Sequence, residues 1–196
     1  MSHTIYHTEG IVLGSIPIGE SNRFLFILTK DLGLLGVVAQ GIRELKSKLR
    51  YSLNTLSHTY IDLVRGKEVW RVTNTQSLHS FTSLVNSQEK IALYARLASL
   101  LRRLMPGESP HEKLYEEFLS GLVFLEQESL NSEQLRSLEA LIVLRVLNEL
   151  GYWGETKKFD EFLNDVTWNR EGLERFSRIR MEANKYINNA LKESHL

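Results

Sequence analysis

Up to about residue 80, the apolar and polar positions follow the pattern of short β-strands. The five predicted strands cover residues 5–13, 23–29, 34–40, 55–65 and 68–73. A tight turn is indicated at Lys30–Gly33, and Gly66–Lys67 joins the last two strands as a hairpin. Five short strands, with one longer connection between the third and the fourth, are typical of a small barrel such as the OB-fold.

Beyond residue 80 the apolar positions recur at helical spacing. Helix starts are marked by capping-box patterns at Asn86–Glu89 and Ser109–Glu112, and by the segment Asn131–Glu133. The predicted helices run through residues 91–104, 114–125, 135–147, about 157–163 and about 170–191. The chain is therefore predicted to be α+β, with an N-terminal five-stranded OB-fold barrel over residues 1–80 and an all-α helical bundle domain over residues 81–196.

Charge is distributed unevenly along the chain, although the 24 Lys and Arg balance the 24 Asp and Glu. Residues 1–80 carry nine cationic side chains against six anionic ones, so the N-terminal part is the better candidate for a surface that binds polyanions. There is no cationic start followed by an apolar run, and no window has the apolar length of a membrane span. We therefore expect a cytoplasmic protein without membrane association.

No pattern for enzymatic chemistry is found. The chain has no cysteine, which excludes disulfides and thiolate-bound metals, and the six histidines show no metal-binding spacing. Gly14–Ser21 has the spacing of a phosphate-binding loop, but Glu20 stands where that loop needs lysine. His58 and Asp62 share a strand face from which Ser57 points away. We expect no enzyme activity, no metal and no cofactor.

The connection Gly41–Arg50 is the most distinctive segment, because it carries four cations and a single acid, Glu44. Such a segment cannot be buried, and phosphate is the commonest partner of a solvated basic connection on a small β unit. A solvated loop without any ligand is the alternative. The candidate nucleic-acid contacts are Arg23, Arg43, Lys46, Lys48, Arg50, Arg65, Lys67 and Arg71, with Trp70 as an aromatic platform on which a base could stack. Phe24 and Phe26 are expected to fill the core of the barrel.

Four arginines are notable in the predicted bundle: Arg96, Arg102, Arg103 and Arg145. The first three lie on or beside one helix, and Arg145 interrupts the apolar stripe of another. A solvated face and a salt-bridged buried arginine would explain them. The functional alternative is a cationic rim around an apolar pocket, which would suit an acidic peptide with a hydrophobic end.

Taken in order, several segments resemble the RecO family of bacterial recombination mediators. The N-terminal segments are Thr8–Leu13, Gly19–Arg23, Phe26–Gly33, Val38–Arg43 and Lys46–Arg50. In the predicted bundle, Leu144–Tyr152 is similar to the end of a family helix, and Ala190–Ser194 is similar to the family's closing segment. The resemblance covers the first 76 residues well and the bundle only in outline.

This resemblance implies an OB-fold that binds single- and double-stranded DNA and anneals complementary strands. It also implies partnership with RecR and with the C-terminal tail of the single-stranded DNA-binding protein, so that the recombinase is loaded in DNA repair at the nucleoid. Many relatives carry a four-cysteine zinc module after the segment that corresponds to Leu144–Tyr152. Trp153–Arg170 contains no cysteine, so this chain is a variant without that module.

Two other functions remain open from the sequence. The first is a protein-interaction adaptor, whose helical bundle binds an acidic peptide while the barrel is only a scaffold. The second is an RNA-binding OB module, because a basic loop does not distinguish DNA from RNA without a group that reads the 2′-hydroxyl.

Overall fold

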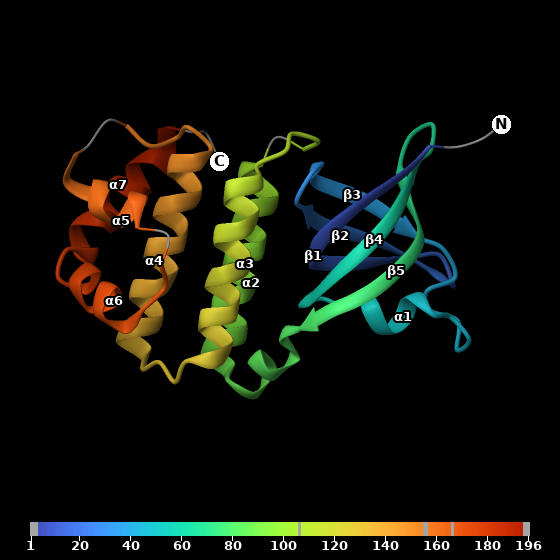
Figure 1. The fold of residues 1–196 in the computed structure, drawn as a ribbon, viewed down its shortest axis with the longest axis horizontal. Coiled ribbons are helices and arrows are strands. Elements are labelled where there is room, and N and C mark those ends of the chain that lie inside the picture. The colour runs from blue at the N-terminus through green and yellow to red at the C-terminus, as the bar shows by residue number, and fades with distance from the viewer. Residues whose placement is uncertain (1–3, 106, 155–156, 166, 194–196) are drawn as a thin grey trace. The chain divides into compact units, whose positions relative to one another are not determined.

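A computed structural model of the chain describes residues 4–105, 107–154, 157–165 and 167–193 (Figure 1). The chain forms two compact units. The barrel unit comprises Met1–Ser83 and Met105–Glu112, and the helical unit comprises Leu84–Leu104 and Lys113–Leu196. The segment 105–112 thus belongs to the barrel unit although it lies between two helices in the sequence.

The barrel unit is a closed five-stranded barrel with the strand order β1-β2-β3-β5-β4. Its elements are β1 (Ile5–Ile18), β2 (Asn22–Thr29), β3 (Gly33–Ala39), α1 (Leu49–Ser52), β4 (Ser57–Arg65) and β5 (Trp70–Ser80). β3 and β5 pair in parallel and the other neighbours are antiparallel. The short helix α1 lies in the connection between β3 and β4. The predicted OB-fold barrel is confirmed.

The two faces of β2 are the reverse of what the sequence suggested. Leu25 and Ile27 belong to the buried barrel core, whereas Phe24 and Phe26 lie on the opposite face and are half-buried. The two phenyl rings contact each other edge to face, with 5.2 Å between their centroids. The expectation that they fill the core was wrong, because successive side chains of a strand point to opposite faces and an unbroken apolar run does not reveal which face is inside.

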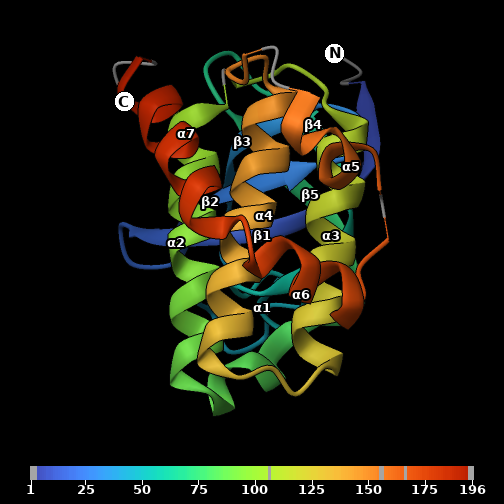
Figure 2. The same ribbon diagram turned by 90° about the vertical axis from the view of Figure 1, so that its left-hand side faces the viewer.

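The helical unit is built around α4 (Ser132–Glu149), which is buried on nearly all sides. The other helical elements are η1 (Phe81–Asn86), α2 (Gln88–Leu104), α3 (Glu112–Gln127), η2 (Lys157–Phe159), α5 (Asp160–Asn164), α6 (Arg170–Ser177) and α7 (Arg180–Glu193). α4 packs against α2, α5, α6 and α7 (Figure 2). A capping box starts it, since Asn131 Oδ1 accepts from the Gln134 amide at 2.9 Å and Gln134 Oε1 accepts from the Asn131 amide at 3.0 Å.

The last predicted helix, 170–191, is two helices that are separated at Arg178 and Ile179. The apolar spacing runs through the break, from Phe176 to Ile179 and Ala183, so the periodicity gives no sign of it. In the part of the chain that the structure describes, no helix has the length and apolar character needed to cross a membrane.

Candidate nucleic-acid interface

Strand register brings cationic segments together at one end of the barrel. β1 ends where β2 begins, with Ile18 opposite Asn22, and the start of β2 lies beside the end of β3, with Arg23 opposite Ala39. β5 begins beside β3, where Trp70 pairs with Val37. This end, which we call the basic end, therefore carries the β1–β2 turn and the connection that leaves β3, whereas the β4–β5 turn lies beside the start of β1, where Val64 is opposite Ile5. Strands lie about 4.8 Å apart, so the Cα atoms of Arg23 and Arg71 are separated by roughly 10 Å across β3.

Three of the predicted residues, Arg23, Arg43 and Arg50, line one polar cavity of about 240 Å³ at the basic end. Ile42 and Asn54 complete its lining. Within the described residues, no carboxylate forms an ion pair with these three guanidinium groups. The structure thus brings together arginines from β2, from the connection and from α1, which we call the arginine pocket.

The start of the connection is fixed by its own backbone. Gly41 adopts a left-handed conformation with φ +63°, and its amide donates to Asn22 Oδ1 at 2.9 Å. The Arg43 amide donates to the carbonyl of Ser21 at 2.9 Å, and Arg43 Nη1 donates to the carbonyl of Gly19 at 3.1 Å. The Arg43 side chain is therefore tied to the β1–β2 turn.

The acid in the connection lies beside the backbone of Gly41 and outside the lining of the arginine pocket. The Glu44 amide donates to the carbonyl of Gly41 at 3.1 Å, and its carboxylate lies beside the Gly41 Cα. Glu44 is not part of the pocket lining. A further acid, Glu20, comes from the β1–β2 turn, so the cations at the basic end outnumber the acids.

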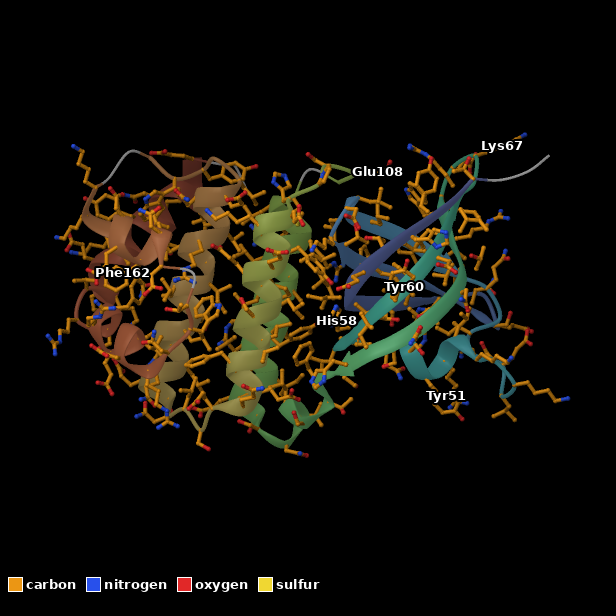
Figure 3. The ribbon with its side chains drawn as sticks, in the orientation of Figure 1. Tyr51, His58, Tyr60, Lys67, Glu108 and Phe162 are labelled. Atoms are coloured by element: carbon orange, nitrogen blue, oxygen red, sulfur yellow. The ribbon has the colours of Figure 1, made fainter. Side chains whose placement is uncertain are left out.

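The remaining predicted cations lie outside the pocket lining and have different surroundings. Lys46 and Lys48 are exposed in the connection, and Lys67 is exposed at the tip of the β4–β5 turn, where it points away from the barrel (Figure 3). Arg71 is exposed on β5. Arg65 differs, because its guanidinium pairs with the Glu108 carboxylate at 3.0 Å and lies 5.4 Å from the centre of the Trp70 ring.

Trp70 is the predicted contact that the structure corrects. Its exposed fraction is only 5%, and its Nε1 donates to Glu108 Oε1 at 3.0 Å. Tyr6 packs edge-on against it, with 5.0 Å between the ring centroids. The indole therefore offers no free face to a base. Tyr51 on α1 is the most exposed aromatic side chain near the pocket, with an exposed fraction of 79% (Figure 3).

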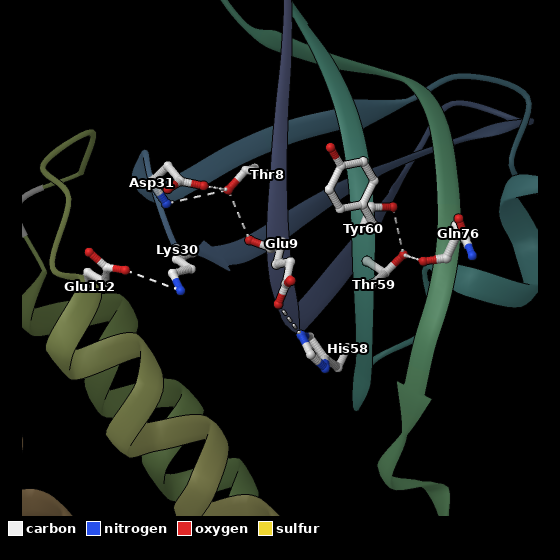
Figure 4. Close-up of polar contacts among 9 residues, drawn as sticks. All are labelled: Thr8, Glu9, Lys30, Asp31, His58, Thr59, Tyr60, Gln76 and Glu112. Atoms are coloured by element: carbon white, nitrogen blue, oxygen red, sulfur yellow. Dashed lines mark hydrogen bonds and ion pairs between the residues drawn. The ribbon is translucent and has the colours of Figure 1, made fainter.

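The sheet formed by β1, β4 and β5 carries polar pairs instead of a basic surface (Figure 4). His58 Nε2 lies 3.2 Å from Glu9 Oε2, and Thr59 Oγ1 donates to the carbonyl of Gln76 at 2.9 Å. Burial lowers the pKa of His58, and the Glu9 carboxylate opposes that shift in part. Asp62 instead pairs with His7 at 2.6 Å, and this hydrogen bond lowers the pKa of Asp62. His58 and Asp62 thus belong to separate pairs.

A second network in the barrel unit ties turns to strands. Thr8 Oγ1 donates to the Asp31 carboxylate at 2.7 Å, and Lys30 pairs with Glu112 at 3.1 Å (Figure 4). The Leu34 amide of β3 donates to the carbonyl of Gly107 at 3.0 Å. The segment 105–112 is thereby attached to the edge of β3 that β5 leaves unpaired.

In the helical unit, a groove of about 500 Å³ lies between α2, α4 and α7. Its apolar lining includes Leu97, Leu100, Val143, Ile187 and Leu191, and its cationic lining is Arg96, Arg136 and Arg180. The Glu139 carboxylate binds Arg96 through two hydrogen bonds of 2.6 and 2.8 Å, which raise the pKa of Arg96. Arg102 and Arg103 are exposed in the last turn of α2 and lie outside this lining. The sequence missed Arg136 and Arg180, since two exposed-looking arginines on separate helices give no signal of a shared groove.

Arg145 does not belong to that rim, which corrects the sequence-based expectation. It is buried, and its Nε donates to the carbonyl of Phe162 at 2.9 Å while Nη2 donates to the carbonyl of Asp165. Its guanidinium carbon lies 4.3 Å from the centre of the Trp168 ring. Burial lowers the pKa of Arg145.

Arg145 therefore organises the segment that follows α4. Trp153–Arg170 has no cysteine, so its residues do not fit a thiolate-bound zinc ion. Among the residues whose positions are described, no group of three or more His, Cys, Asp or Glu side chains could hold a metal ion.

An OB-fold barrel followed by a helical unit defines the class of proteins that combine an OB-fold with a second, all-α domain. Residues 1–81 match the family described as Recombination protein O N terminal. The resemblance to the RecO family that the sequence showed is thus confirmed.

Three relatives illustrate the similarity, and each is named DNA repair protein RecO. The Heliobacterium modesticaldum protein is 32% identical over 77% of this chain and 53% of its own length. The Thermodesulfovibrio yellowstonii protein is 31% identical over 78% of this chain and 60% of its own length. A Dehalococcoides mccartyi protein is 29% identical over 78% of this chain and 59% of its own length. The chain thus spans between about half and three fifths of these relatives.

Proposed function

We propose that this protein is a DNA repair and recombination mediator that binds DNA through the basic end and anneals complementary single strands. The observation that carries the proposal is the convergence of Arg23, Arg43 and Arg50 from three chain segments on one pocket of an OB barrel, with Lys46 and Lys48 exposed in the same connection. The similarity to relatives that are named DNA repair protein RecO supports it.

Annealing requires no covalent step and no catalytic group. Two strands repel each other through their phosphates, and cations on a protein surface reduce that repulsion until base pairing can start. Arginine is suited to this task, because its planar fork donates two parallel hydrogen bonds to one phosphate. Each neutralised phosphate releases counterions, so the affinity for DNA should fall steeply with salt.

Fluorescence anisotropy with a labelled single-stranded DNA, at several salt concentrations, tests DNA binding. The triple variant Lys46→Ala, Lys48→Ala, Arg50→Ala should bind more weakly, with a salt slope that is smaller by roughly 0.7 for each lost phosphate contact. The matched control removes three exposed cations from the helical unit, through Arg178→Ala, Lys185→Ala and Lys192→Ala. Equal affinity and slope in both folded triple variants would exclude the basic end as the DNA site.

Annealing and partner binding are measured separately. Complementary strands that carry a fluorophore and a quencher report annealing directly, and a pull-down with RecR reports that partnership. A matched RNA strand added as competitor distinguishes the DNA mediator from an RNA-binding module. If RNA displaces DNA at equal concentration, the proposed preference for DNA is wrong.

The groove between α2, α4 and α7 supports a second proposal, the binding of the acidic C-terminal tail of a single-stranded DNA-binding protein. Apolar side chains and three arginines meet there, which suits a peptide with acidic residues before a hydrophobic end. Leu100→Asp and Arg136→Ala should each weaken binding of a labelled tail peptide, whereas Arg103→Ala, outside the lining, should not. Tail binding without DNA binding at physiological salt would favour the adaptor function instead.

A further inference from the structure

The arginine pocket has the properties of a site for a single anion, beyond those of a surface that tracks a DNA backbone. It is concave, and three guanidinium groups line it without a carboxylate. Two of these groups are held by neutral oxygens, through Arg43 Nη1 to the Gly19 carbonyl at 3.1 Å and Arg23 Nη1 to Ser15 Oγ at 3.5 Å. Each guanidinium has five N–H donors, so most donors of the pocket stay available to a ligand.

The charge and shape favour a phosphate monoester over a diester. A monoester carries a charge of about −1.5 to −2 and three terminal oxygens, whereas an internal DNA phosphate carries a single charge and two such oxygens. Three arginines that approach from β2, from the connection and from α1 can each contact a different oxygen. A diester also needs room for the chain to enter and to leave, which a surface groove provides more readily than a pocket.

We propose that the arginine pocket binds the terminal phosphate monoester of a nucleic-acid strand, so that this protein recognises phosphorylated strand ends. This inference rests on the proposed DNA-binding function and names a ligand for one part of that site. The fixed Arg43 side chain and the left-handed Gly41 hold the pocket ready before the ligand arrives, which reduces the entropy lost on binding.

Anisotropy with single strands of identical sequence tests this proposal. One strand carries a 5′-phosphate, one carries a 3′-phosphate and one has hydroxyls at both ends. A fourth strand has hydroxyl ends and one additional nucleotide, which adds a diester charge at the same place. We expect one of the phosphorylated strands to bind about tenfold more tightly than the hydroxyl strand, and the longer strand to differ by less than about twofold.

Variants test whether the preference for a phosphorylated strand comes from the arginine pocket. Arg50→Ala should abolish it, and Arg50→Lys should reduce it because the charge remains while the fork is lost. Arg71→Ala, on the exposed face of β5, should weaken the binding of all four strands but keep the preference. Inorganic phosphate at millimolar concentration should remove the preference and leave most of the binding to the hydroxyl strand.

The outcomes separate the two proposals. If all strands bind with equal affinity, the terminal-phosphate site is refuted while DNA binding stands. If the preference survives in Arg50→Ala, the monoester binds elsewhere and the pocket assignment is wrong. If no strand binds even at low salt, the proposed function itself fails.

Discussion

Replacing Arg145 by alanine should destabilise the helical unit by about 3 kcal/mol. The carbonyl oxygens of Phe162 and Asp165 would lose their donors; the buried Phe162 acceptor would cost about 1–3 kcal/mol, and the part-buried Asp165 acceptor less. The contact with the Trp168 ring contributes up to about 2 kcal/mol more. Burial disfavours the charged form of Arg145 and lowers its pKa. Removing this buried charge therefore offsets part of the lost stability.

Urea unfolding followed by far-ultraviolet circular dichroism measures this loss, because helices dominate that signal. A loss of about 3 kcal/mol is a change of roughly 150-fold in the unfolding equilibrium constant. Arg136→Ala is the matched control on the same helix, since Arg136 is exposed and pairs only with Glu133, at 3.2 Å. It should change the stability by less than about 0.5 kcal/mol.

Arg145→Lys separates the charge from the geometry. A lysine keeps the cation, but its single ammonium cannot reach two carbonyls in the fixed directions of a guanidinium fork. We therefore expect a stability between those of the parent protein and Arg145→Ala. A loss below about 1 kcal/mol in Arg145→Ala, with an unchanged dependence on urea, would show that the two carbonyls find other partners and would refute this reasoning.

Three further predictions concern the barrel unit. Glu108→Gln should free Arg65 from its ion pair and raise the affinity for DNA about two- to threefold at low salt, as measured by anisotropy, and an unchanged affinity would contradict this. The pKa of His58 is lowered in the folded state, so the contribution of its neutral ring to the free energy of unfolding is present above pH 6.5 and is lost as the pH falls through the folded-state pKa. Unfolding measured at several pH values should show this fall in stability. His58→Gln should make the stability less dependent on pH in this range. Gly33→Ala should lower the thermal stability clearly more than Gly19→Ala. Both glycines have a positive φ, but a Cβ at Gly33 would lie 2.3 Å from the Ser109 carbonyl oxygen, whereas the space around Gly19 is open. An equal loss of stability in the two variants would refute the tight packing at Gly33.

The barrel could be predicted from the sequence because strand patterns and turn residues are local signals. The inward faces could not be predicted in every strand. In β2 the apolar run Phe24–Leu28 is continuous, and only pairing with β1 and β3 decides that Leu25 and Ile27 point inward. Trp70 is buried by Tyr6 and Glu108, and the latter lies 38 residues further along the chain, so no local pattern reports its burial.

The basic connection could also be predicted, because four cations in ten residues must stay in water. The arginine pocket could not, since it depends on the side chain of Asn22 and on the left-handed backbone of Gly41. In the helical unit, the sequence showed that Arg145 interrupts an apolar stripe but not which groups it contacts. Its role follows from two backbone carbonyls that are 17 and 20 residues away in the sequence.

The zero formal net charge of the chain does not argue against DNA binding, because the two units use their cations differently. The ion pairs of the helical unit include Arg96–Glu139, Lys158–Glu182, Arg170–Glu128 and Arg175–Glu161. In each pair a neighbouring carboxylate cancels the field of the cation beyond a few ångströms, and salt screens the remainder. The three guanidinium groups of the arginine pocket are held by neutral oxygens or by none, so no ion pair cancels their field. The attraction for phosphate should therefore depend on a few residues at the basic end, and removing paired cations of the helical unit should leave the affinity for DNA nearly unchanged.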